Sequence, residues 1–160
     1  MINRLLPILI TSVLLAGCTK TETTKGGIAQ EMELAKTCWR CDNVFLSSGY
    51  CPVMIFWERR GNTHCSMYAY SDKTEAFYQL KGYSYKIGYS EGGADVTLYD
   101  KNARYYLGHI IDGQLVFSIY PDIFYDNIAS LQKHEGPLSF TQVKKTDLPG
   151  LLDTINELFH

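Results

Sequence analysis

The sequence has few of the patterns that mark an enzyme or a metalloprotein. It contains only four histidines, and no two of them have the HxxxH or HxH spacing that places two metal ligands on one face of a helix or strand. Ser47-Ser48-Gly49 does not match the G-x-S-x-G nucleophile elbow, and Gly92-Gly93 lacks the surroundings of a phosphate-binding loop. We therefore expect no catalytic residue, no metal site and no cofactor. The histidines are His64, His109, His134 and His160.

An excess of positive charge is also missing. The chain carries 15 Lys and Arg against 17 Asp and Glu, which gives a formal charge of −2. Without residues 1–17, in which Arg4 is the only charged side chain, the formal charge becomes −3. Nucleic acids and anionic membranes are bound through clustered Lys and Arg. The composition therefore argues against a general nucleic-acid-binding surface.

No hydrophobic run is long enough to cross a bilayer as a helix. The longest, residues 5–15, is interrupted by Pro7, Thr11 and Ser12 and falls short of the roughly 20 apolar residues that a spanning helix needs. The order of its surroundings is that of an export signal, because Arg4 precedes the run and the small residues Ala16 and Gly17 follow it. The alternative is a buried or signal-anchor helix that happens to end in a cysteine.

Leu15-Ala16-Gly17-Cys18 resembles the lipobox of bacterial lipoprotein precursors, and the resemblance covers residues 1–19 only. It implies that residues 1–17 are a signal peptide that is removed and that Cys18 is the lipidation site, carrying diacylglycerol and a further acyl chain such as palmitate. Several acyl chains give stable anchoring in a membrane. Thr19 is not the aspartate that typically retains lipoproteins in the inner membrane. The resemblance therefore implies an envelope protein of the outer membrane that faces the periplasm.

The rest of the chain divides into a tether and one domain. Residues 18–36 are polar and Thr-rich and contain Gly26-Gly27, which predicts a flexible lipid-anchored tether. Residues 37–160 have the size of a single compact domain. The whole chain is 46% hydrophobic and 20% charged, and it contains 12 Tyr, 7 Phe and 2 Trp. Such an aromatic load is typical of sheets, where these side chains fill the core and cover the sheet surface. The functional alternative is that some of them form a carbohydrate- or peptide-binding face.

Four cysteines follow Cys18, and an even number in an exported chain predicts two disulfide bonds. Residues 52–58 and 64–70 are joined by residues 59–62, and this pattern predicts a hairpin. With the turn centred near Arg60–Gly61, Cys65 lies opposite Phe56 and Cys51 lies near the far end, opposite Tyr70. The two cysteines then point to opposite faces and lie too far apart for a disulfide. We therefore expect Cys38 and Cys41 each to bond to one of Cys51 and Cys65, in an order that the sequence leaves open.

Cys38-Trp39-Arg40-Cys41 also allows two other interpretations. A redox-active CxxC pair needs its first thiol at a helix N-terminus, usually in a βαβ scaffold, and no such pattern surrounds it. The C-x2-C-x9-C-x13-C spacing could bind zinc, but it lacks the second close pair of a zinc ribbon. A thiol–disulfide oxidoreductase that uses Cys38 and Cys41 remains the enzymatic alternative.

The periodicities predict an α+β domain. Residues 83–89, 95–99, 104–111 and 114–120 form a meander, in which Asp112-Gly113 is a strong hairpin signal. Residues 138–144 add a strand. Three helices are expected at residues 73–81, at 121–133 and at the C-terminus, where leucines and Ile155 form one apolar stripe. The predicted fold is an antiparallel sheet of five to seven strands with two or three helices packed on one face.

Together these patterns favour a non-enzymatic binding or assembly module of the cell envelope. The membrane is reached through the lipid on Cys18, and a protein partner in the envelope is expected, for example in a secretion or conjugation machine. A small disulfide-bonded β domain could alternatively inhibit an extracellular enzyme, although no matching motif is present.

Overall fold

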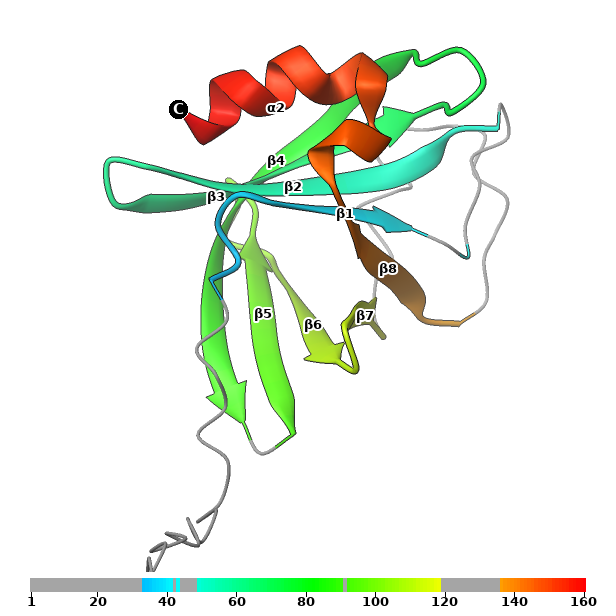
Figure 1. The fold of residues 1–160 in the computed structure, drawn as a ribbon. Coiled ribbons are helices and arrows are strands. Elements are labelled where there is room, and N and C mark those ends of the chain that lie inside the picture. The colour runs from blue at the N-terminus through cyan, green and yellow to red at the C-terminus, as the bar shows by residue number, and fades with distance from the viewer. Residues whose placement is uncertain (1–32, 42, 44–48, 91, 119–135) are drawn as a thin grey trace, which may run out of the picture.

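Eight antiparallel strands follow one another around a closed barrel in the computed structural model, and the last strand pairs with the first (Figure 1). The structure describes residues 33–41, 43, 49–90, 92–118 and 136–160. The strands are β1 Thr37–Cys41, β2 Cys51–Arg59, β3 Asn62–Tyr70, β4 Phe77–Ser90, β5 Gly93–Tyr99, β6 Tyr105–Ile111, β7 Gln114–Phe117 and β8 Leu138–Val143. Two 3₁₀ turns, η1 Lys145–Asp147 and η2 Pro149–Leu151, lead into the helix α2 Leu152–Phe159.

The predicted α+β class is wrong, because the sheet closes on itself. A closed sheet covers its own inner face and has no free edges, so it does not need two or three helices packed on one side. The helix expected at residues 73–81 is largely strand, since β4 begins at Phe77. The helix expected at 121–133 lies outside the described residues. Within the described residues α2 is the only α-helix, and it confirms the C-terminal part of the prediction.

Both predicted hairpins are confirmed. In the β2–β3 hairpin, Cys51 pairs with Tyr70 and Phe56 pairs with Cys65, as expected. Its turn residues Arg60 and Gly61 have φ angles of 52° and 76°. Positive φ at both central residues is the mark of the two-residue type I′ turn, which matches the twist of the flanking strands. Asp112 and Gly113, with φ of 51° and 76°, make the same turn between β6 and β7.

The inside of the barrel is filled by side chains. An eight-stranded barrel is just wide enough to be packed by its own residues or to hold one small ligand. Here the inward positions carry large apolar groups that are almost completely buried, and Leu34, ahead of β1, joins them. The largest inward side chains with under 2% exposure are Trp39, Met54, Phe56, Met67, Leu98, Leu115, Phe117 and Phe140.

A second apolar cluster lies outside the barrel, beneath the C-terminal segment. Leu148, Leu151 and Ile155 are fully buried against the outward residues of β2 and β3, including Val53 and Ile55. In Figure 1, α2 lies across this face. Trp57 of β2, together with Leu158 and Phe159 of α2, packs at the margin of the cluster. The helix thereby fixes the outer surface at the end of β2.

Strand β4 is bent at a β-bulge. Met67 pairs with Lys81 whereas the next residue, Tyr68, pairs with Gln79, so Leu80 is the extra residue of β4. A bulge bends its strand and increases the local twist. Beyond the bend, β4 leaves the face covered by α2 and continues as a hairpin with β5 (Figure 1). The outward side of β4 just after the bulge is therefore open, and it forms the site described next.

Candidate functional site

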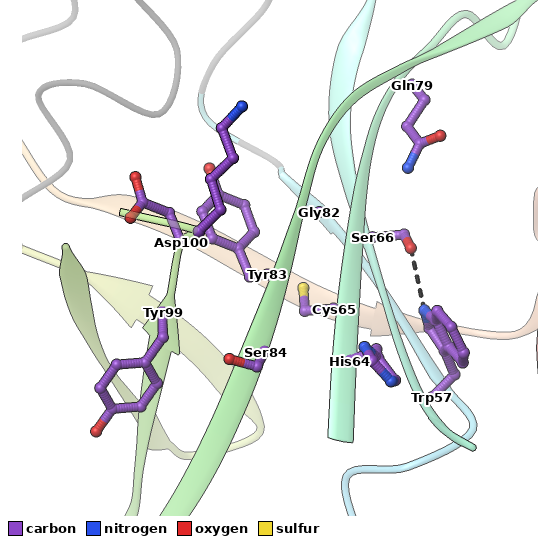
Figure 2. A pocket seen from close by; sticks show the side chains of 11 residues that line it. Trp57, His64, Cys65, Ser66, Gln79, Gly82, Tyr83, Ser84, Tyr99 and Asp100 are labelled. Atoms are coloured by element: carbon purple, nitrogen blue, oxygen red, sulfur yellow. Dashed lines mark hydrogen bonds between the residues drawn. The ribbon is translucent and has the colours of Figure 1, made fainter. Parts of the chain in front are cut away.

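Four outward residues lie side by side across four strands, and we call them the cross-strand row. Trp57 of β2 pairs with His64 of β3, His64 pairs with Ser84 of β4, and Ser84 pairs with Tyr99 of β5. Since neighbouring strands are about 4.8 Å apart, the row spans about 15 Å. Figure 2 shows Tyr99, Ser84, His64 and Trp57 in this order. Three rings and one small side chain thus share one line on the surface.

A hollow of about 370 Å³ is lined by Ser84, with His64 and Tyr99 among its other lining residues (Figure 2). Its depth comes from small residues at neighbouring outward positions, since Ser66 pairs with Gly82 directly beside the row. A Cβ on Gly82 would meet nothing within 4 Å, so the space above this glycine is open. The hollow therefore exists because the residues at the bend of β4 and beside it have small side chains.

The Trp57 end of the row is rigid. The rings of Trp57 and His64 stack with centroids 4.3 Å apart and planes inclined by 23°. The indole Nε1–H of Trp57 donates a hydrogen bond of 3.0 Å to Oγ of Ser66, which Figure 2 draws as a dashed line. Trp57 also packs beside α2. These contacts hold the imidazole of His64 in place at the edge of the hollow.

The other end of the row is cationic. Nζ of Lys86 lies 5.6 Å from the ring centroid of Tyr99, within the range of a cation–π contact. Lys101 lines the hollow from the turn after β5. On the far side of His64, a second hollow of about 400 Å³ is lined by Arg59, Arg60 and Asn62. Positive side chains therefore flank the cross-strand row at both ends.

Asp100 is the only acidic residue that lines either hollow among the described residues, and its charge is already engaged. Its carboxylate accepts hydrogen bonds from the backbone N–H groups of Asn102 and Arg104 and from Nε of Arg104 at 3.0 Å. Nζ of Lys81 lies 3.6 Å away. Burial opposes ionisation, but these hydrogen bonds and the guanidinium prevail and lower the pKa of Asp100. The carboxylate thus shapes the turn and is not offered to a ligand.

The four cysteines of the domain divide between the two faces of the barrel wall. Cys38 and Cys51 belong to the outer cluster, and Cys41 and Cys65 to the inner one. Cys38 lies opposite Ile55, four residues and about 13 Å along the strand from Cys51. Cys41 and Cys65 lie on β1 and β3 with β2 between them, also beyond the usual 4.4–6.8 Å between bonded cysteines.

Cys38 and Cys65 carry free thiols in the structure. Both connectivities expected from the sequence use these two residues, so neither is formed here. Pairs on opposite faces point apart, and pairs on the same face are too distant, so an oxidised form would require the ladder to shift. Disulfide formation in the exported protein stays a prediction.

The environment of Cys38 and Cys41 gives no support to a thiol–disulfide enzyme. Both lie on a strand, three residues apart, and therefore point to opposite faces. Both are 2% exposed. Burial raises the pKa of Cys38 to about 12, with the charge of Lys145 only partly opposing it, whereas a reactive thiol needs a lowered pKa.

The remaining candidates can be placed briefly. Cys18 lies outside the described residues. No group of three His, Cys, Asp or Glu suited to a metal ion occurs in the described part of the chain. Asp95 contacts Nδ1 of His109 across β5 and β6 at 2.7 Å, on the half-exposed outer surface. Within residues 33–160 as far as described, no helix is long and apolar enough to cross a membrane.

Comparison with known proteins finds no family model, no curated protein and no solved structure that matches this chain. The cross-strand row was not among the residues singled out from the sequence. The predicted hairpin register nevertheless contained part of it, because pairing Phe56 with Cys65 also pairs Trp57 with His64. Ser84 and Tyr99 could be added only with the register of the later strands.

Proposed function

We propose that the protein is a lipid-anchored, non-enzymatic binding module of the bacterial cell envelope, held at the outer membrane and facing the periplasm through Cys18. The anchor rests on the lipobox Leu15-Ala16-Gly17-Cys18. The binding role is supported by one observation above all, which is that the interior of the barrel is filled while its outer wall carries a preformed aromatic and cationic hollow. Recognition therefore takes place on the outside of the barrel.

The geometry also explains why binding is favoured over catalysis. A catalytic site needs a nucleophile or base held beside an orienting partner. In the hollow, His64 stacks on Trp57, Ser66 accepts a hydrogen bond from the same indole, and Asp100 is paired with Arg104. The polar groups thus support a shape rather than a chain of proton transfers.

The anchor is tested by expressing the full chain with radiolabelled palmitate and separating inner and outer membranes on a density gradient. The wild-type protein is expected to be labelled and to fractionate with the outer membrane. Cys18→Ser should lose the label and the membrane association, and Thr19→Asp should keep the label but move to the inner membrane. Wild-type protein that is recovered unlabelled, with residues 1–17 still present, would contradict the proposal.

The binding role is tested by photo-crosslinking in living cells. A photoreactive amino acid at Gln79, which lines the hollow, should give a discrete crosslinked product in the envelope, whereas the same group at Ser90, at the other end of the same strand, should give none. Equal crosslinking at both positions would show that the hollow is not a specific binding surface.

A further inference from the structure

We propose that the hollow binds an acidic segment of a partner protein and seats one aromatic side chain of that segment between His64 and Tyr99. This inference rests on the proposed binding function and specifies the chemistry of the partner. It follows from the gap at Ser84 between two ring-bearing strands, the small residues beside it and the distribution of charge around it.

The cross-strand row has one gap that a further ring can fill. His64 and Tyr99 are separated by β4 alone, so the backbones of their strands are two spacings, or about 9.6 Å, apart. Between them, Ser84 is the only member of the row without a ring. A ring seated above Ser84 would lie between these two strands, and aromatic pairs are stable with ring centroids about 4.5–7 Å apart.

The floor of the hollow includes small residues. Gly82 and Ser66 have little or no side chain above the backbone, and Ser66 is held by the indole of Trp57 at 3.0 Å. Because the stack on Trp57 already fixes His64, little side-chain freedom remains to be lost there on binding. A site whose side chains are ordered before binding loses less conformational entropy when the ligand binds, and its affinity is higher for that reason.

The charges select an acidic segment. Arg59 and Lys101 flank the two ends of the row, and Lys86 lies beside Tyr99. Guanidinium and ammonium groups offer donors only, and they match carboxylates in both charge and geometry. Asp100 does not cancel this field, since Arg104 and Lys81 already neutralise it.

Two other classes of ligand fit less well. A neutral glycan would make no use of the positive charges that flank the row, and the one carboxylate that lines the described hollows is engaged. An anionic membrane would require apolar residues at the tip of the basic hairpin, where residues 59–62 are Arg, Arg, Gly and Asn.

The test uses a capped pentapeptide of sequence EDYDE, added to ¹⁵N-labelled protein beginning at residue 18 with Cys18→Ser. Amide shifts are expected around His64, Ser84 and Tyr99. The ring-free peptide EDADE should bind at least fivefold more weakly, and the basic peptide KRYRK should not bind. Shifts caused equally by all three peptides, or none by EDYDE, would overturn the proposal.

Two pairs of variants locate the site. Ser84→Tyr fills the gap with a ring of the protein's own and is expected to abolish binding of EDYDE, whereas the matched Ser90→Tyr, six residues along the same face of β4, should leave it unchanged. Arg59→Glu with Lys101→Glu should weaken binding roughly tenfold, since each exposed charge contributes a few-fold. Lys73→Glu with Lys144→Glu makes the same change in net charge elsewhere and should have no effect. Equal effects within either pair would refute the location.

Glycan and membrane ligands are tested in the same titration as the peptide. A glucuronate oligosaccharide or anionic lipid vesicles that shift the same amides more strongly than EDYDE would show that the hollow serves a glycan or a membrane, and either result would overturn the assignment. The Cys18→Ser protein used in the peptide titration carries no lipid. A negative result of the lipidation experiment in cells would therefore leave the peptide-binding result unaffected. Loss of peptide binding would likewise leave the lipidation result standing.

Discussion

Replacing Ile155 by alanine tests whether α2 is part of the folding unit that supports the cross-strand row. Ile155 has no exposed surface and lies in the outer cluster with Val53, Ile55 and Leu151. The substitution removes three carbon groups at about 0.8 kcal/mol each, or about 2.4 kcal/mol of transfer free energy. The cavity that remains adds to this cost, and such truncations typically cost about 2–5 kcal/mol.

We therefore expect the free energy of unfolding to fall by about 3 kcal/mol, after the modest gain in helix propensity that alanine brings. For a domain of roughly 130 residues this corresponds to a drop in Tm of about 10–12 °C. Urea denaturation and thermal circular dichroism measure both quantities. Ile155→Val should cost about 0.5–1.5 kcal/mol.

The matched control is Glu157→Ala, an exposed position two residues further along the same helix. It should change stability by no more than about 0.5 kcal/mol. If Ile155→Ala were no more destabilising than Glu157→Ala, the packing of α2 on β2 would be wrong. The rigid support inferred for Trp57 would then be lost as well.

Three further predictions concern the barrel wall. Gly108→Ala should cost about 1–3 kcal/mol in urea denaturation, because its Cβ would lie 2.7 Å from two ring carbons of the buried Phe117; an unchanged midpoint would contradict the inner packing. Asp100→Asn should lower the free energy of unfolding at neutral pH. Because the pKa of Asp100 is lower in the folded than in the unfolded protein, the difference in free energy of unfolding between wild type and variant should shrink as the pH falls through the folded pKa. A difference that does not change with pH would show that the ionised carboxylate is not the stabilising form. Cys38 and Cys65 should resist thiol reagents in the native protein at pH 8 and react on unfolding, because burial raises both thiol pKa values, that of Cys38 to about 12; a peptide map with Cys51 bonded to Cys65 would contradict the β2–β3 register.

Local signals in the sequence were sufficient for the hairpins. Asp112-Gly113 identified the β6–β7 turn, and the Arg60-Gly61 turn fixed which residues of β2 and β3 face each other. Both turns need positive φ at two consecutive residues, a requirement that leaves a mark in the sequence. The stripe of Leu151 and Ile155 likewise located the C-terminal helix, although the chain enters it through two 3₁₀ turns.

Closure of the barrel could not be predicted in the same way. The pairing of β1 with β8 joins residues about a hundred positions apart, so no local pattern encodes it. Residues Thr37–Cys41 were interpreted through their CxxC spacing and not as a strand. In the structure they form β1, and Trp39 is one of the largest buried side chains inside the barrel. The helix expected at residues 73–81 is a further case, because the chain there makes a turn into β4.

The same non-local origin explains why the candidate site could not be recognised in advance. Its four central residues come from four strands, and only their alignment across the sheet makes Ser84 a gap between two rings. None of the four is unusual in its own segment. What sets the site apart is a contrast of sizes along one line, large at Trp57, His64 and Tyr99 and small at Ser84, beside a bulge that turns β4 away from α2. A barrel whose interior is already full can vary such contrasts on its outer wall without disturbing its core, and the binding site that we propose for this protein is built from them.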